Sequence, residues 1–278
     1  MTENLTPELR AHFGEGGLRS LPAAPAGPLR NPGLPLQVGP YFFLAEPSDP
    51  LSLGEYAAQR GLDAGPVANQ LRIGTDCGAQ FYLAPDHSVR AVLLGSDIPE
   101  LAVNHSIEAF AAGLLLLDRY LPTLGDAEAP EAGFAAYREL RQRLLQLDAT
   151  AFECRESWWP RVLDDLRQPL NVGSSAAFEY SDSNGITHIV TETGAPGLPH
   201  PEQLVWNRLR AVGVEPEQVT RVYCELEPCL LPGRYCSLWL AETFPNAEFT
   251  HRFDYGETAA SREEGIKALM LLAAELHG

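Results

Sequence analysis

The sequence lacks any uninterrupted run of about eighteen apolar residues, the length that a membrane-spanning helix needs. Its first residues contain no basic segment followed by an apolar one, so we expect no secretory signal peptide. Cysteine is scarce, and the five that occur are an odd number without the spacing of a disulfide scaffold. These absences predict a cytoplasmic protein with reduced thiols and no membrane partner.

Positive charge is also in short supply. The 278 residues include 20 basic and 37 acidic side chains, a net charge of −17, and Lys267 is the one lysine. Residues 173–278 alone have 7 basic and 15 acidic side chains, so the acidic excess is present in both halves. This balance argues against a protein that holds nucleic acid mainly through phosphate contacts. A nucleic-acid substrate would need a local groove of arginines, for which Arg208, Arg210, Arg221, Arg234, Arg252 and Arg262 are available.

Residues 1–168 are expected to form a mixed α+β domain. Ser106 is placed to cap an amphipathic helix, and Pro122 is predicted to end it. We expect residues 45–67 to be loop and Pro169 to interrupt the chain near the domain boundary. The other patterns predict a short helix at 7–13, a strand at 41–44, an antiparallel meander at 71–74, 80–83 and 89–94, a helix at 131–147, and an apolar face at 158–166.

Residues 169–278 are expected to form a second domain, in which strands and helices alternate. Asn184-Gly185 between two strand patterns predicts a β-hairpin. The alternation after it implies a layered α/β domain, with helices on the faces of a sheet. The predicted strands lie at 176–180, 186–191, 219–226 and 249–255, and the helices at 204–212, after Cys236, and around 266–273.

Three residues in this second domain have the types and order of a catalytic zinc site. His200, Cys229 and Cys236 offer one nitrogen and two thiolates, a set that leaves a fourth position for water. His200 lies at the entry to one predicted helix and Cys236 at the start of the next. Glu202, two residues after the histidine, is placed to shuttle protons. His-x-Glu followed by Pro-Cys and a second Cys is the signature of the zinc deaminases.

The spacing of the thiols departs from that signature. Six residues separate Cys229 from Cys236, where Cys-x-x-Cys is usual. Cys224 could replace one ligand, or could add a fourth and make the zinc purely structural. Its position inside a predicted strand favours a small buried apolar role instead.

Residues 176–278 resemble the bacterial nucleic-acid and nucleotide deaminases of polymorphic toxin systems, in the cytidine deaminase-like superfamily. This resemblance implies a three-layer α/β fold, a Zn²⁺ cofactor held by His200, Cys229 and Cys236, and Glu202 as the catalytic proton shuttle. The segments that carry it are His200-Pro201-Glu202, Glu225 to Cys229, Pro232 to Cys236, and Phe253 to Gly256.

Residues from about 36 to 168 resemble the SUKH superfamily of immunity proteins. The resemblance implies an α+β module that binds a cognate toxin or immunity protein and has no catalytic residues of its own. It is carried by Val38 to Tyr41, Leu71 to Asp76, Val103 to Ser106, and Trp158 to Pro160.

The two resemblances together imply a deaminase of a bacterial conflict system. Conversion of cytosine to uracil in nucleic acid is favoured, with DNA first. A free cytidine or nucleotide deaminase is the alternative that the acidic charge supports, and a catalytically silent toxin-binding protein is the third. The intact Glu202 argues against the silent protein. Candidate substrate contacts are Tyr235, Phe253, Tyr255 and Arg234, although helix and strand periodicity favours core positions for the aromatic ones.

Overall fold

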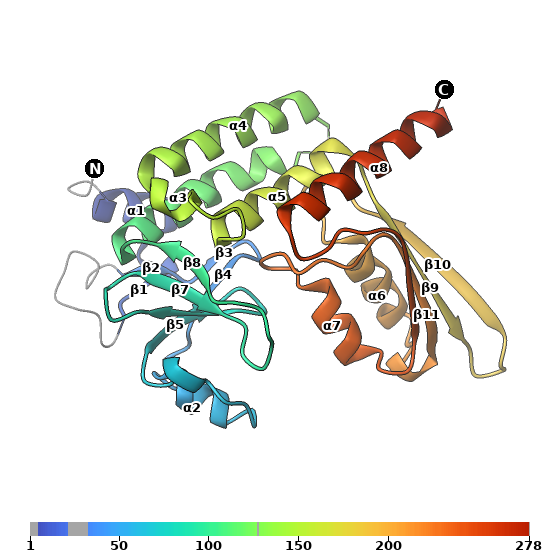
Figure 1. Ribbon diagram of the computed structural model, residues 1–278, viewed down its shortest axis with the longest axis horizontal. Helices are drawn as coiled ribbons and strands as arrows, with labels where there is room; N and C mark the ends of the chain where they lie inside the picture. Colours follow the sequence, from blue (N-terminus) through green and yellow to red (C-terminus); the bar gives the residue numbers. More distant parts are fainter. Residues whose placement is uncertain (1–4, 22–32, 127, 278) are drawn as a thin grey trace. The chain divides into compact units, whose positions relative to one another are not determined.

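The chain folds into two compact units (Figure 1), and the computed structural model describes residues 5–21, 33–126 and 128–277. The N-terminal unit comprises residues 1–122 and 138–163, and the C-terminal unit comprises 123–137 and 164–278. Helix α5 (Trp158–Asn171) therefore begins in one unit and ends in the other. The predicted domain limit between residues 168 and 169 stays a prediction.

The N-terminal unit is built on a six-stranded antiparallel sheet with the strand order β3-β4-β5-β6-β7-β8. The predicted meander is confirmed as β5, β6 and β7, whereas β8 was not expected from the sequence. A separate pair, β1 (Leu18–Arg19) and β2 (Leu34–Pro35), is also antiparallel. The strands of the large sheet are β3 (Gln37–Val38), β4 (Phe42–Leu44), β5 (Leu71–Thr75), β6 (Gln80–Leu83), β7 (Val89–Val92) and β8 (Leu101–Asn104).

The helices correct three sequence predictions. The segment expected to be loop contains α2 (Leu53–Ala58), whose first turn is capped by Ser52 Oγ accepting from Glu55 N at 3.2 Å. Pro122 and Pro169 were expected to interrupt the chain, yet both lie inside helices. Each proline sits in the last turn, where only one backbone hydrogen bond is lost. The remaining helices are α1 (Leu5–Phe13), α3 (Ile107–Leu124) and α4 (Pro130–Leu147).

Two adjacent tryptophans fill the core of the N-terminal unit, as the apolar face of α5 predicts. Trp158 and Trp159 are almost completely buried. Their indole N–H groups donate to Asp76 Oδ2 and Asn104 Oδ1, each at 2.8 Å. Buried indoles need such partners, because an unpaired N–H in the core costs free energy. Asp76 and Asn104 therefore fix the two rings and are structural.

Asp148 ends this buried polar chain. Its carboxylate accepts hydrogen bonds from Asn104 Nδ2 at 2.8 Å, His105 N at 3.0 Å and Thr150 Oγ1 at 2.7 Å. Burial raises the pKa of Asp148, but these donors outweigh it and lower the pKa to about 2. Its carboxylate therefore stabilises the fold only while it is ionised.

We expect Asp148→Asn to lower the free energy of unfolding by about 2 kcal/mol at pH 7. The pKa of Asp148 is lower in the folded chain than in the unfolded chain. Its carboxylate therefore stabilises the fold above about pH 4, and this stabilisation is lost as the pH falls toward 2. The difference between wild type and variant should therefore shrink across that interval. Urea unfolding followed by tryptophan fluorescence at pH 7, 4 and 3 measures it, and an unchanged difference at pH 3 would contradict this role.

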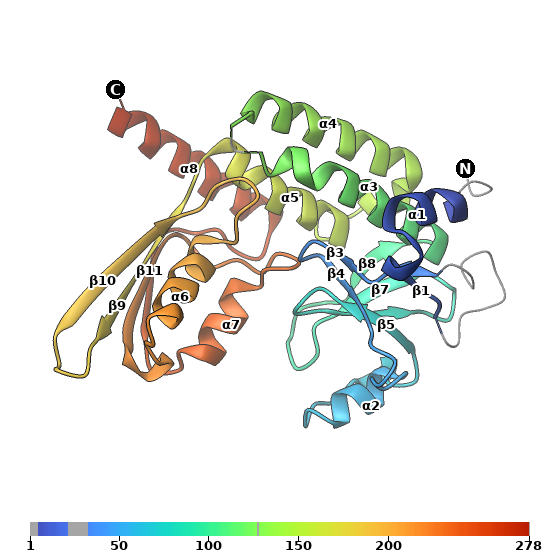
Figure 2. The same cartoon turned by 180° about the vertical axis from the view of Figure 1, so that it is seen from behind.

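The C-terminal unit has a four-stranded sheet with the order β10-β9-β11-β12. The β9–β10 and β9–β11 pairs are antiparallel, and β11–β12 is parallel. The predicted hairpin and layered α/β fold are confirmed. Figures 1 and 2 show α8 on one side of the sheet and α6 and α7 on the other. The elements are β9 (Ser175–Ser181), β10 (Thr187–Thr193), α6 (Pro201–Ala211), β11 (Val219–Leu226), α7 (Cys236–Thr243), β12 (Glu248–Phe253) and α8 (Ala259–His277).

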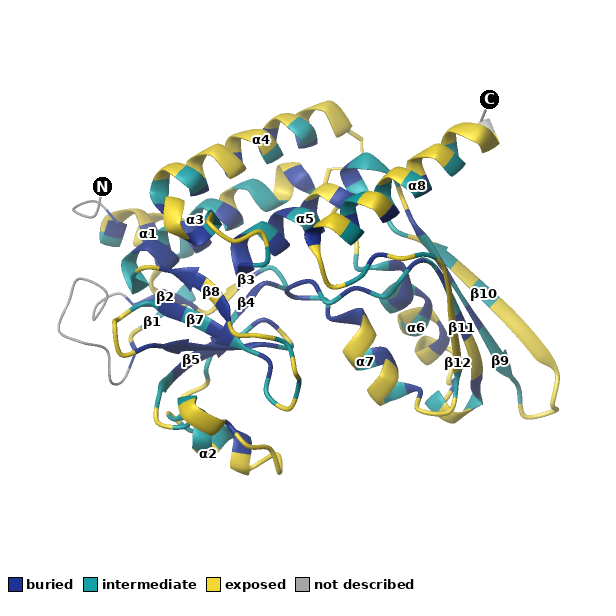
Figure 3. Cartoon of the chain, in the orientation of Figure 1, coloured by how far each residue is buried: buried dark blue, intermediate teal, exposed yellow. Residues whose placement is uncertain are grey.

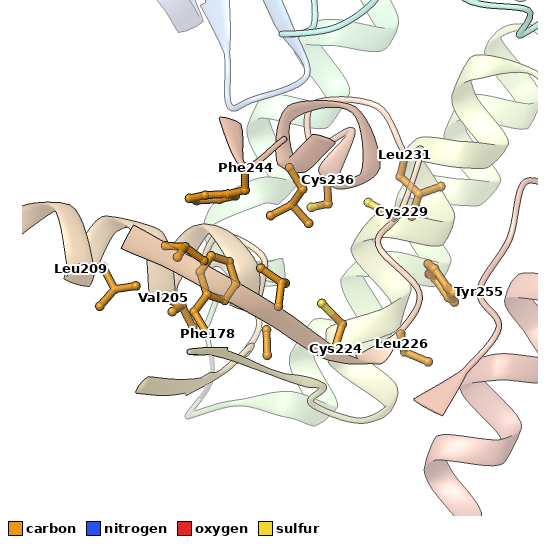
Figure 4. Close-up of a cluster of buried hydrophobic side chains, with 14 of the residues drawn as sticks. Phe178, Val205, Leu209, Cys224, Leu226, Cys229, Leu231, Cys236, Phe244 and Tyr255 are labelled. Carbon is orange, nitrogen blue, oxygen red and sulfur yellow. The ribbon is translucent and has the colours of Figure 1, made fainter. Parts of the chain in front are cut away.

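The core of the C-terminal unit lies between the sheet, α6 and α7, with Leu269 added from α8 (Figure 4). Phe178 of β9, Val205 of α6 and Leu240 of α7 are fully buried in it. In contrast to these core residues, most residues of β10 are exposed to solvent (Figure 3). None of the helices in the described ranges has the length and apolar character needed to span a membrane.

Candidate active site

His200 occupies the N-cap position of α6, with an extended backbone at φ −60° and ψ 152°. The following residue, Pro201, favours this conformation, because its ring disfavours a helical residue before it. Pro201 itself fits the first helical position, where the N–H has no intrahelical partner. The helix therefore begins directly after His200, and Glu202 falls in its first turn, 5% exposed.

The two cysteines come from the connection between β11 and α7. Cys229 lies in the loop after β11, and Cys236 is the first residue of α7. Tyr235, with φ 41°, turns the chain into the helix, and Ser237 N donates to the carbonyl of Cys229 at 3.1 Å. Both thiols are buried, and Figure 4 shows the two side chains near each other, Cys236 on α7 and Cys229 on the preceding loop.

The predicted ligand atoms converge on one point. His200 Nδ1 lies 3.5 Å from Cys229 Sγ and 3.4 Å from Cys236 Sγ, and all three atoms are within 4.8 Å of one another. A tetrahedral zinc with ordinary bond lengths would separate a nitrogen and a sulfur ligand by about 3.6 Å. The donor set and its spacing therefore fit zinc.

The protonation of these groups also suits a cation. Burial lowers the pKa of His200, but Cys229 and Asp165 outweigh this and raise it to about 10. Burial raises the pKa of Cys229, yet the Cys236 thiol and His200 bring it well below its usual value. Burial and the neighbouring Cys229 raise the pKa of the Cys236 thiol well above its usual value. The cluster thus holds an imidazolium beside a thiolate, and a divalent cation would displace the remaining protons.

Glu202 stands beside this cluster with a carboxylate oxygen unused. Its Oε2 is buried and has no hydrogen-bond partner in the part of the chain that the structure describes. Burial raises the pKa of Glu202, against a lowering effect of His200. His200, Glu202, Cys229 and Tyr255 line a cavity of about 20 Å³, together with Gln168 and Ser174. A buried carboxylate at a cavity wall can exchange a proton with a molecule inside it.

Cys224 lies apart from the predicted ligands. It is buried in β11, and the group of close ligand atoms found among the described residues does not include it. Burial, followed by Glu202, raises the pKa of Cys224 well above its usual value. These surroundings suit a protonated thiol in the core of the unit.

The four predicted substrate contacts occupy different surroundings. Tyr255 is 2% exposed and lines the cavity beside Glu202. Tyr235 is buried at the N-cap of α7, and Phe253 packs against the core at the end of β12. Arg234 has its Nε 3.5 Å from Asp165 Oδ2 and its Nη2 3.5 Å from the carbonyl of Leu198. Their contact with a substrate stays a prediction.

Sequence reasoning missed two carboxylates near the site. Asp165 Oδ1 lies 2.8 Å from His200 Nε2, and its helix showed only an apolar face in the sequence. Glu227 Oε2 accepts from the backbone N–H groups of Tyr255 at 3.1 Å and Gly256 at 2.7 Å, which fixes the loop that carries Tyr255. Glu227 could have been suspected from its position two residues before Cys229. Asp165 had no such signal.

Comparison with known proteins gives two family matches. The protein-family model described as SUKH-4 immunity protein matches residues 8–165. The family model described as Xanthomonas-like deaminase matches residues 171–272. No curated protein and no solved structure matches the chain.

Proposed function

Since the chain belongs to the SUKH-4 immunity protein family and carries a Xanthomonas-like deaminase domain at residues 171–272, we propose that it is a zinc-dependent deaminase of a toxin and immunity system. The proposed reaction is hydrolysis of cytosine to uracil and ammonia, with nucleic acid as substrate and DNA favoured. The observation that carries the proposal is the convergence of His200 Nδ1 and two thiols next to the buried carboxylate of Glu202.

The chain's residues divide the chemistry between them. His200, Cys229 and Cys236 would hold the zinc ion, which when bound supplies a water molecule acidified to near neutral pH. Glu202 would take one proton from the attacking water and deliver it to the base ring, and would then carry the second proton, from the added hydroxyl group, to the amino group that leaves as ammonia. Its buried position supports this role, because burial raises the pKa of Glu202 and so favours uptake of the proton from the water.

The cavity beside Glu202 has room for one water molecule and not for a base. Its volume is about 20 Å³, and a single water needs about 10–15 Å³ on this measure. Tyr255 and Gln168, which line it, would have to move for a pyrimidine to enter. We infer that substrate binding opens the site, as loops do in many enzymes.

The substrate class can be read from a conversion assay on the zinc-loaded full chain. Single-stranded DNA, double-stranded DNA, RNA and free cytidine and adenosine compounds would be tested by sequencing and mass spectrometry. We expect cytosine conversion in single-stranded DNA, falling steeply as salt rises from 50 to 200 mM, because phosphate contacts release counterions. Salt-insensitive turnover of free cytidine would move the proposal to a nucleotide deaminase.

A second role is proposed for the N-terminal unit. The SUKH-4 match covers more than half of the chain, and immunity modules act by binding a partner protein. We propose that this unit binds a cognate toxin or immunity protein. If the zinc-loaded chain converts none of the substrates above, partner binding would remain as the chain's function.

A further inference from the structure

Asp165 contacts the proposed metal ligand from the side opposite the thiols. It lies on α5 with its side chain 2% exposed, and its Oδ1 is 2.8 Å from His200 Nε2. The other ring nitrogen, Nδ1, lies 3.5 and 3.4 Å from the two sulfur atoms. Each nitrogen of His200 therefore has a separate kind of neighbour.

This arrangement determines which nitrogen carries the hydrogen. A neutral imidazole has one N–H donor and one lone-pair acceptor. A carboxylate accepts hydrogen bonds only, so Nε2, which lies 2.8 Å from Asp165 Oδ1, is the nitrogen placed to carry the hydrogen. In the neutral ring that a metal would bind, the lone pair is then on Nδ1. That lone pair points to where the thiols are. A histidine bound to a metal through one nitrogen usually donates its other N–H to a carboxylate or carbonyl.

We propose that Asp165 is a positioning residue that holds His200 in the tautomer and orientation needed to bind zinc. This inference rests on the proposed zinc site. Asp165 precedes residues 171–272, which match the deaminase model, and is the last residue of the SUKH-4 match. The zinc site is thus completed by a side chain outside the deaminase match.

Asp165 and the neighbouring Asp164, in the middle of α5, pair with different arginines. Arg234 Nε lies 3.5 Å from Asp165 Oδ2, so a guanidinium adjoins the oxygen that His200 does not use. Asp164, the preceding residue, pairs with the buried Arg262 at 3.0 Å through both Nε and Nη2. Asp164 is a matched control, because it is an aspartate on the same helix turn whose carboxylate pairs with Arg262 rather than with His200.

The test compares zinc affinity in the full-length chain and in variants, measured by competition with a chelator. We expect Asp165→Asn to weaken zinc binding 10- to 100-fold, as loss of such a partner does in other metal sites. Asp165→Glu should recover part of the loss. Asp164→Asn should keep wild-type zinc affinity even where it lowers the melting temperature. Equal zinc affinity in Asp165→Asn and the wild type would overturn the inference.

A second measurement needs no variant. Nitrogen NMR of the zinc-loaded wild type should show His200 with a protonated Nε2 and a metal-bound Nδ1. A metal-bound Nε2 would contradict the positioning role even if zinc binds well. A wild-type chain that binds no zinc would overturn the proposed zinc site, and this inference with it. Zinc binding in the wild type with an unaffected Asp165→Asn variant would overturn this inference alone.

Discussion

Glu202→Gln is expected to abolish deamination while leaving zinc bound. Glutamine has nearly the same size but cannot take up or release a proton at this site. General acid–base catalysis is worth about 10²–10⁴-fold in rate, so activity should fall by at least about 100-fold. The carboxylate oxygen Oε2 has no hydrogen-bond partner among the described residues, so this amide replacement should cost the fold little.

The measurement pairs a conversion assay with a zinc determination on the same sample. Glu192→Gln is the control, because Glu192 accepts a hydrogen bond at 2.7 Å from Arg208, on the helix that also carries Glu202. It removes one negative charge beside α6 and should leave the rate unchanged. Full activity in Glu202→Gln would remove this residue from the mechanism.

The regular elements were predictable where the pattern is local. The strand expected at 219–226 has those bounds in the structure, and the helix after His200 was placed within a few residues. Alternation and helical periodicity depend on neighbours along the chain, which the sequence contains. The strand β8 (Leu101–Asn104) is as long as β6 and β7 but was not expected from the sequence, and its pairing with β7 defines it.

The prolines show the limit of a local rule. Pro122 is followed by two more helical residues, and Leu124 is 3% exposed. Burial of that leucine offsets the hydrogen bond that the proline removes near the helix end. A sequence shows the proline but not the packing beyond it, so the predicted helix stops too early.

The residues of the candidate site also differ in whether the local sequence could predict them. The order His200, Cys229, Cys236 was visible because each residue follows a predictable turn at the start of a helix or the end of a strand. Asp165 belongs to an earlier helix, and only the folding of the chain brings it to His200. The candidate metal ligands could thus be predicted from motif and order, whereas finding Asp165, the residue proposed to orient His200, requires the tertiary structure.

Cys236→Ala is expected to remove zinc and activity together, and Cys224→Ala to leave both. The two substitutions are matched, because each removes one thiol from a side chain that is no more than 1% exposed. Any cost from lost packing should therefore be similar in both variants. The zinc content per chain should fall to background in Cys236→Ala alone, because Cys224 lies outside the group of converging ligand atoms in the described residues.

Cobalt substitution would count the thiolates directly. Two thiolate ligands in the wild type and in Cys224→Ala would support a site with an open position for water, as a catalytic zinc needs. Loss of metal from Cys224→Ala, with three thiolates counted in the wild type, would instead indicate a closed site of four protein ligands. A closed site has no position for the attacking water, so that result would contradict the proposed hydrolysis at this metal site.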